Sequence, residues 1–366
     1  MRTLAVLLLA VVAFAGHPTI AQADVQSDIN AACLTGGTVQ MPPAVTVTTT
    51  LNLVCDPGTT PLTLKGAPTV ITCQTGAAPC LKVGSNAADN GSRLNLKVRD
   101  VHLVGPGRAV VGSEGIRVLP TADDSAFDGL KIDGFEKGMR LIGGDILLIG
   151  VRVSNSDISS IWNPSVDTAV HLDGRVANIY FTSFALNGWR RVILSDGPGG
   201  TGASASFTHG RLNSTWNPGT AAVYVESSDG VAHELLLSDI EDWETACPYV
   251  EIGHGGRVAI NGVAFWSDPQ QSGIRPGIIV GNTPTAVSWL RMSNVNVTHC
   301  SGEGNLVTVN SPSTFTTITG SDLTGRVQFN AAGQASFTGN RFLGSSCLNG
   351  TLTGVRAAAN VNCADR

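Results

Sequence analysis

The segment GIRVLP, residues 115–120, shows the unit from which this chain is built. It is a short apolar-x-apolar strand, with Ile116 and Val118 on either side of Arg117, followed by turn residues. The unit returns as GMRLIGG from residue 138, AVHLDG from 169, RVILSDG from 191, AVYVESSDG from 222, YVEIGHGG from 249, GIIVGN from 277, LVTVNS from 306 and RVQFNAAG from 326. The first apolar residues of successive units are 20 to 31 residues apart, and repeats of about 20 to 50 residues are typical of solenoids or propellers.

A second unit lies between these strands and consists of an apolar pair, a Gly, Ser, Asn or Asp kink, and another apolar pair. Examples are FDGLKIDGF (127–135), VAINGVAF (258–265), WLRMSNVNV (289–297) and ASFTGNRFL (335–343). Each repeat therefore offers three short strands separated by sharp bends. That is one coil of an all-β, right-handed parallel β-helix, a solenoid whose coils stack about 4.8 Å apart. A β-sandwich or a propeller fits less well, because propeller blades need about 40 or more residues and antiparallel hairpins.

The first 23 residues have the features of a secretory signal. Arg2 supplies the positive start, residues 4–15 the apolar stretch, and Ala21-Gln22-Ala23 the small-x-small cleavage pattern. The mature chain should begin at Asp24 and be secreted, to the extracellular space or the periplasm. No membrane span is expected, because the apolar stretch is too short and no later segment has about 20 apolar residues in a row.

Composition and charge narrow the classes of partner. The chain has 43 Gly and only 14% charged residues, as many short strands and tight turns require. Without Arg2, 22 basic residues face 28 acidic ones, which leaves the mature chain at −6. A nucleic-acid partner is therefore not expected.

All eight cysteines lie in the predicted mature chain. An even number in an exported protein favours disulfides over metal thiolates, and no CxxC pair is present, so no metal site is expected. The pairs we expect are Cys33 with Cys55, Cys73 with Cys80, and Cys347 with Cys363. They would fasten the two ends of the solenoid, where a stacked fold frays first.

The N-terminal stretch SDINAACLTGGTVQMPPAVTVTTTLNL, residues 27–53, resembles the N-terminal cap of pectate-lyase-like right-handed β-helix proteins. The shared order is a short amphipathic capping helix, a Gly-Gly turn, a strand, a Pro-containing turn and the first coil. That superfamily includes polysaccharide lyases, glycoside hydrolases, epimerases and phage tailspikes, so the resemblance implies an architecture and not one activity. It suggests a single domain over residues 24–366, with a cap at 24–60, coils at about 61–345 and a C-terminal cap at 346–366.

In proteins of this shape the strand after the third bend, here the GIRV-type strand, usually forms the floor of a saccharide groove. Alternation along a strand turns its middle residue outward. The predicted outward column is Arg117, Arg140, His171, Ile193, Tyr224, Glu251, Ile279, Thr308 and Gln328. The next outward position adds Asp173, Glu226 and His254. Ionisable and aromatic groups thus concentrate between Arg117 and Glu251.

Tryptophans form a second predicted column in the loops that lead into the groove strands. They are Trp162, Trp189, Trp216, Trp243 and Trp266, at spacings of 27, 27, 27 and 23 residues. One interpretation is a row of platforms for stacking sugar rings. The other is an aromatic ladder packed under the loops, since Trp buries a large area.

Two kinds of sugar-chain cleavage are compatible with these residues. A hydrolase needs two carboxyl groups, which Glu226 and Glu251 on neighbouring coils, or Asp173 and Glu226 two coils apart, could supply. A lyase needs a base and a cation that neutralises a uronate carboxylate, roles open to Arg140, His171 and Tyr224. No cofactor is assigned, because a hydrolase requires none, although a lyase could use Ca²⁺.

The sequence predicts a secreted polysaccharide-active enzyme, either a lyase or a glycoside hydrolase, that binds an extended glycan along its groove. The predicted catalytic residues are Arg140, His171, Asp173, Glu226 and Glu251, and the predicted binding residues are Trp162, Trp189, Trp216, Trp243, Tyr224 and His254. The alternative is a non-catalytic glycan-binding or structural spike on a cell or virion surface. The later coils, where Ile279, Thr308 and Gln328 point outward, could be the packing surface of a homotrimer.

Overall fold

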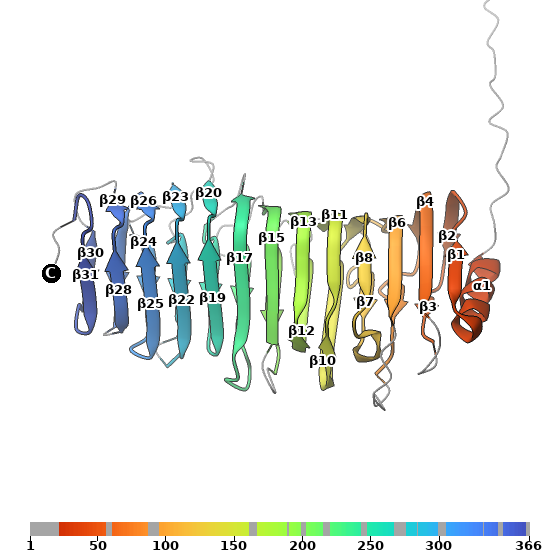
Figure 1. Ribbon diagram of the computed structural model, residues 1–366, viewed down its shortest axis with the longest axis horizontal. Helices are drawn as coiled ribbons and strands as arrows, with labels where there is room; N and C mark the ends of the chain where they lie inside the picture. The colour runs from red at the N-terminus through yellow and green to blue at the C-terminus, as the bar shows by residue number, and fades with distance from the viewer. Residues whose placement is uncertain are drawn as a thin grey trace, which may run out of the picture.

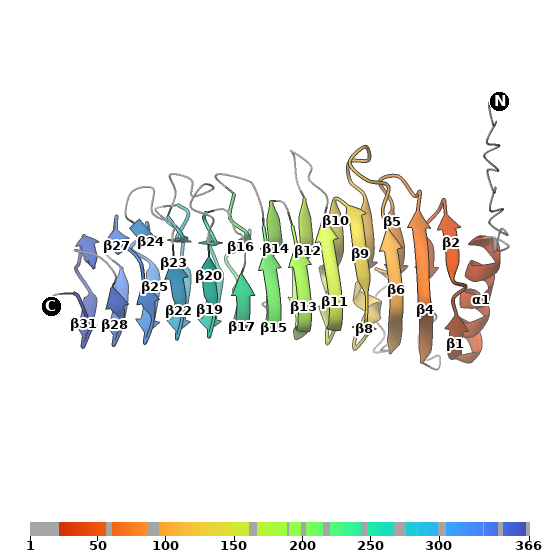
Figure 2. The ribbon, with the colours of Figure 1, turned by 90° about the horizontal axis from the view of Figure 1, so that it is seen from above.

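The computed structural model is an elongated stack of coils, with the N-terminal helix at one end and the last strand at the other (Figures 1 and 2). It describes residues 22–55, 61–86, 95–160, 167–188, 190–198, 203–214, 220–242, 247–266, 276–283, 285–298, 305–331, 333–342 and 347–363. Nearly all of the predicted secretory signal, residues 1–21, lies outside these ranges. No helix within them is long and apolar enough to cross a membrane.

The strands of the described ranges form two sheets, and within each sheet every pair of neighbouring strands is parallel. Among the described residues sheet I has 12 strands: β3 (Leu51–Leu53), β5 (Pro79–Val83), β7 (Glu114–Val118), β10 (Lys137–Ile149), β12 (Thr168–Ala177), β14 (Arg191–Asp196), β16 (Val223–Val225), β18 (Val250–Ile252), β21 (Ile278–Val280), β24 (Asn305–Val309), β27 (Arg326–Phe329) and β30 (Leu348–Gly350). These are the GIRV-type strands of the repeat. A short 3₁₀ helix, η1 (Pro120–Ala122), follows β7.

Sheet II has 19 strands in the described part of the chain and contains the other two strands of each coil. They are β1 (Gly37–Gln40), β2 (Ala44–Val47), β4 (Leu62–Cys73), β6 (Leu96–Val104), β8 (Ala126–Asp128), β9 (Lys131–Phe135), β11 (Arg152–Ser160), β13 (Ile179–Asn187), β15 (Ala203–Asn213), β17 (His233–Asp242), β19 (Gly256–Asn261), β20 (Ala264–Trp266), β22 (Ser288–Ser293), β23 (Asn296–Thr298), β25 (Thr314–Thr319), β26 (Asp322–Leu323), β28 (Gln334–Thr338), β29 (Arg341–Phe342) and β31 (Val355–Ala358). The predicted all-β, right-handed parallel β-helix is confirmed.

The predicted kink is a corner that divides sheet II into two faces. A residue with positive φ stands there on each of these coils: Asp100, Gly129, Asn155, Ser183, His209, Asp239, Gly262, Asn294, Gly320, Gly339 and Ala359. Gly, Asn and Asp tolerate this left-handed conformation better than other residues. The repeated Gly, Ser, Asn or Asp in the sequence therefore marks a bend of the backbone.

One position of the predicted outward column was wrong. In the coil RVILSDG, Ile193 pairs with Val170 and is fully buried in the core, whereas Leu194 takes the outward place beside His171. The prediction aligned this coil with its neighbours at the first apolar residue. The register is instead set by the turn after each strand, where Gly174 and Gly197 both have positive φ. Aligning the two coils at this turn moves β14 by one residue relative to the predicted alignment, which exchanges its inward and outward residues.

The interior between the sheets is filled by stacked apolar side chains. Phe181 and Phe207, on neighbouring coils, stack with ring centroids 4.5 Å apart, and Phe184 meets Phe207 edge to face. Val, Ile and Leu from both sheets continue the same core along the axis. Such burial is the main stabilising contribution of a stacked fold.

Helix α1 (Gln22–Thr35) closes the N-terminal end, as the capping prediction required. It buries Val25, Ile29 and Cys33 against the first coil. The Gln26 amide accepts a hydrogen bond from the backbone N–H of Asn52 (2.8 Å) and donates one to the carbonyl of the same residue (3.0 Å). The backbone groups of Asn52, in the first strand of sheet I, are therefore satisfied by a side chain.

The three predicted disulfides are confirmed. They join Cys33 to Cys55, Cys73 to Cys80, and Cys347 to Cys363. Two of them hold the first coils together and the third holds the last. Such cross-links are expected in an oxidising compartment.

A polar ladder runs inside the corner at the C-terminal end. The side chain of Asn340 accepts a hydrogen bond from the N–H of Ser321 (3.0 Å) and donates to the carbonyl of Ile318 (2.8 Å) and to the side chain of Asn360 (3.1 Å). Asn340 is fully buried. Its amide therefore satisfies backbone groups that water cannot reach.

We expect Asn340→Ala to lower the free energy of unfolding by about 2–3 kcal/mol, because it leaves buried backbone groups without partners. The midpoint of urea unfolding, followed by circular dichroism, measures this change. The control is Asn330→Ala, which removes only an exposed hydrogen bond to Asn310. Equal midpoints for the two variants would contradict a structural role for the ladder.

Candidate functional site

The middle residues of the sheet I strands form one outward column, in which each residue pairs with the one on the next coil. The column is Lys82, Arg117, Arg140, His171, Leu194, Tyr224, Glu251, Ile279, Thr308 and Gln328. In the adjacent position Asp173 pairs with Asp196, and Glu226 follows on the next coil. The five residues predicted as catalytic thus share one face, while their roles stay predictions.

The first part of this face is a network of paired charges. Glu114 accepts hydrogen bonds from Arg117 Nε (2.6 Å) and Arg140 Nη1 (3.0 Å). Arg140 also binds Asp173 through Nε (3.1 Å) and Nη2. Burial alone would raise the pKa of Glu114, but the two guanidinium groups together lower it below its usual 4.5. Arg140 therefore has carboxylate partners on both of its neighbouring coils.

We expect Glu114→Gln to lower the free energy of unfolding by about 3 kcal/mol at pH 7, because two partly buried arginines lose a carboxylate. A carboxyl with a lowered pKa in the folded state stabilises the protein above its unfolded pKa, and this contribution is lost as the pH falls through the folded value. The difference between wild type and variant should therefore shrink below about pH 4.5. The midpoints of urea unfolding of both proteins, measured from pH 7 to pH 3, give this difference in stability.

The matched control is Glu234→Gln. Glu234 forms an ion pair with Arg257 at 2.9 Å, but its side chain is 55% exposed. An exposed pair contributes under about 1 kcal/mol, so this variant should change the midpoint little at any pH. A similar loss in both variants would contradict the role of burial at Glu114.

His171, Asp173 and Asp196 form a cluster beside this network. His171 Nε2 lies 2.7 Å from Asp196 Oδ1. Burial would raise the pKa of Asp196, but the hydrogen bond and charge of His171, with the charge of Arg191, lower it. One ligand atom from each of the three residues lies within 4.8 Å of the others. One imidazole and two carboxylates suit a transition metal better than Ca²⁺, and a metal would compete with Arg140 for Asp173.

Tyr224 is the centre of a second cluster, two coils further along. Its hydroxyl donates a short hydrogen bond to Glu226 Oε2 and accepts one from Asn282 Nδ2 (3.1 Å). The guanidinium of Arg191 lies over the Tyr224 ring, 4.4 Å from its centroid. Burial, followed by the bond to Glu226, raises the pKa of the Tyr224 hydroxyl far above its usual 10.

Arg191 is the cation of this second cluster. It is half-buried, and burial lowers the pKa of its guanidinium, while the charges of Tyr224, Glu251 and Asp196 act in the opposite direction. A guanidinium stays charged in proteins all the same. Among the described residues Arg191 has no carboxylate ion pair, in contrast to Arg140. It can therefore offer hydrogen bonds to an anionic ligand over the Tyr224 ring.

His254 and the predicted binding tryptophans are not part of either cluster as the structure describes it. His254 lies in the turn after β18, where its Nδ1 accepts a hydrogen bond from the N–H of Val287 (3.2 Å), so it is a turn residue and does not join the Tyr224 cluster. The four predicted binding tryptophans, Trp162, Trp189, Trp216 and Trp243, lie outside the described residues. Trp266 lies within β20 of sheet II, and its side chain is not described.

Sequence reasoning missed four residues of these clusters: Glu114, Arg191, Asp196 and Asn282. The signal for Asp196 was the shared Asp-Gly of AVHLDG and RVILSDG, since alignment on that turn places Asp196 beside Asp173. The same alignment places Arg191 in the column of Glu114, Lys137 and Thr168. Nothing in the local sequence marks Asn282, which lies 58 residues beyond Tyr224.

The fold can be compared with that of known proteins. No family model and no curated protein matches the sequence. Among solved structures, the A-module of mannuronan C-5 epimerase AlgE6 from Azotobacter vinelandii is similar with a TM-score of 0.58 and 14% identity, over 94% of each chain. Tailspike protein 2 from the Escherichia coli O157:H7 bacteriophage CAB120 is similar with a TM-score of 0.56 and 15% identity, over 92% of this chain and 44% of the tailspike.

These similarities concern the fold. The chain has a right-handed parallel β-helix, the fold that its N-terminal cap suggested. It spans less than half of the tailspike. Fold alone does not fix activity, so the function must be argued from the two clusters on sheet I.

Proposed function

We propose that this protein is a secreted polysaccharide-active enzyme that cleaves a uronic-acid-containing glycan bound along the outward column of sheet I. The observation that carries the proposal is the Tyr224 cluster, in which the hydroxyl is bonded to Glu226 and the ring lies beneath the guanidinium of Arg191. The similarity to a mannuronan epimerase module is consistent with a uronate ligand. The disulfides are consistent with export.

The cluster fits β-elimination. Arg191 would bind the uronate carboxylate and stabilise the negative charge that develops when the neighbouring C–H proton is removed. That proton passes to the Tyr224 oxygen as the phenol proton moves to Glu226. The electron pair of the C–H bond forms a C=C bond, the glycosidic C–O bond breaks, and the proton on Glu226 goes to the leaving oxygen.

Hydrolysis fits the same residues less well. An acid-catalysed hydrolase keeps one carboxyl group protonated near neutral pH through a raised pKa. Glu226, the carboxyl of this cluster, accepts the hydrogen bond of the Tyr224 hydroxyl, so it is placed to receive a proton rather than to keep one of its own. We therefore favour a lyase over a glycoside hydrolase.

We expect Tyr224→Phe to lower turnover of a uronic-acid polysaccharide at least about 100-fold, because the proton-transferring oxygen is removed. Arg191→Met should raise KM and lower kcat, because the carboxylate loses its cation. Alginate, polygalacturonate and a neutral glucan are the substrates, and both unsaturated-product absorbance and new reducing ends are recorded. Arg99→Gln, at an exposed arginine of sheet II away from this column, is the control and should act like wild type.

New reducing ends without unsaturated product would show hydrolysis instead. Unchanged turnover in Tyr224→Phe would refute the assignment of the cluster.

One observation favours a non-catalytic glycan-binding or structural spike. Arg117 and Arg140 are already paired with Glu114 and Asp173, and such mutual pairing is typical of a structural ladder. Saturable glycan binding without any product, unaltered by Tyr224→Phe, would support this function. Sedimentation velocity would test the predicted homotrimer in either case.

A further inference from the structure

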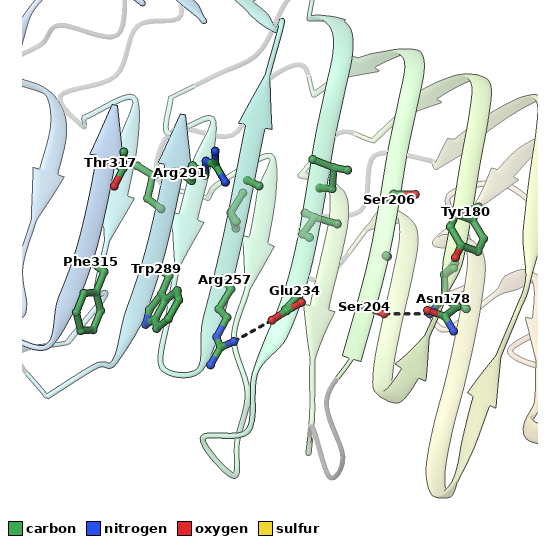
Figure 3. A pocket seen from close by; sticks show the side chains of 17 residues that line it. Asn178, Tyr180, Ser204, Ser206, Glu234, Arg257, Trp289, Arg291, Phe315 and Thr317 are labelled. Atoms are coloured by element: carbon green, nitrogen blue, oxygen red, sulfur yellow. Dashed lines mark hydrogen bonds and ion pairs between the residues drawn. The ribbon is translucent and has the colours of Figure 1, made fainter. Parts of the chain in front are cut away.

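A trough of about 770 Å³ lies on the outside of sheet II, away from the sheet I column. It crosses β13, β15, β17, β19, β22 and β25, all on the side of the corner that follows sheet I in the chain (Figure 3). A second hollow, on β25, β28 and β31, shares Phe315 and Thr317 with it. The two form one continuous path along the axis toward the C-terminal end.

Exposed aromatic rings stand at both ends of the main trough. Figure 3 shows Tyr180 at one end and Trp289 with Phe315 at the other. These three side chains are 41%, 43% and 40% exposed. The Trp289 and Phe315 rings lie 5.1 Å apart. Side chains of this size are rarely left in water without a partner, and together they form an apolar surface.

The floor between the aromatic ends is made mainly of small and polar side chains, with the exposed Leu236 among them. Ser206 and Ala259 face outward in the same register as Tyr180, with Leu236 between them. Ser204 and Asn178 border the Tyr180 end, where the Ser204 hydroxyl accepts a hydrogen bond from the N–H of Asn178 (3.0 Å). The trough thus combines apolar platforms with hydroxyl and amide groups, as a ligand with both apolar faces and hydroxyl edges requires.

The charges along the path are mainly positive. Arg257 is paired with Glu234 at 2.9 Å and lies 4.4 Å from the centroid of the Trp289 ring. Arg291 and Arg356 are exposed and have no carboxylate partner among the described residues. Three arginines therefore face one glutamate, in a protein whose formal net charge is −5. This local excess of cations is complementary to an anionic ligand.

We propose that this trough is a second binding site, for an extended acidic glycan whose rings lie on Tyr180, Trp289 and Phe315. Carboxylate or sulfate groups of the glycan bind Arg291 and Arg356. Sugar rings have an apolar C–H face and a hydroxylated rim, which match the platforms and the serine floor. The inference goes beyond the proposed function, because it holds whether or not sheet I is catalytic. With this second site the protein has two extended polysaccharide-binding surfaces, one on sheet I and one on sheet II.

A second copy of this chain is a less suitable occupant. Packing two such faces together would bring one positively charged path against another and bury Arg291 and Arg356, which have no carboxylate partner among the described residues, and burying an unpaired charge is costly. A single extended chain instead leaves the charged rim in water. The test below includes the oligomeric state for this reason.

The test measures binding by the full chain carrying Tyr224→Phe, so that turnover does not consume the probe. Calorimetry at low salt uses alginate and polygalacturonate as carboxylated probes, dextran sulfate as a sulfated probe, dextran as a neutral probe and oligo(dT) as a nucleic acid. We expect Phe315→Ala and the double variant Arg291→Gln/Arg356→Gln each to weaken acidic-glycan binding at least about fivefold. A difference between the carboxylated and sulfated probes identifies the preferred anion.

The control variant is Arg99→Gln. Arg99 is an exposed arginine of sheet II, on β6, three coils before Tyr180, and its loss should leave the affinity unchanged. Equal affinity in all variants would overturn the proposal, as would tighter binding of oligo(dT) than of any glycan. A change of sedimentation coefficient in Phe315→Ala would overturn it in favour of a second copy. Loss of product formation in Tyr224→Phe is recorded separately, so failure of the catalytic assignment stays distinguishable.

Discussion

The structure depends on the backbone hydrogen bonds that hold each coil in register on the next. Because all pairings are parallel, a residue on one coil lies directly beside the matching residue of the next. Two residues 31 positions apart, such as Arg140 and His171, thereby become neighbours on one surface. The charge network, the Tyr224 cluster and the trough all exist only through this register. A slip of one residue would exchange the inner and outer faces of a strand.

The architecture was readable from the sequence because its signals are local. Alternating apolar residues mark the strands, a Gly, Asn or Asp marks most of the corners, and even the disulfides follow from their position at the ends of the stack. The exception at Ile193 shows the limit of this reasoning. Its coil carries one more residue before the Asp-Gly turn than AVHLDG does, and backbone conformation at Gly197, not apolar pattern, decided which side chain faces inward.

The candidate site was predictable only in part. A column of outward residues follows from alternation, but the contacts within it depend on turns of unequal length, as at Asn282, which reaches back to Tyr224 from two coils away. The trough on sheet II was not anticipated. Its aromatic residues, Tyr180, Trp289 and Phe315, occupy outward positions that the repeat pattern does not single out, so only the folded coils bring them onto one surface.

The capping helix has a consequence for self-association. A primary amide carries the same donor and acceptor as a peptide group. The Gln26 side chain therefore forms with Asn52 the two hydrogen bonds that the backbone of one further strand would form. The terminal rung is therefore not an open template for another molecule, and end-to-end growth into fibres is blocked at this pole of the rod.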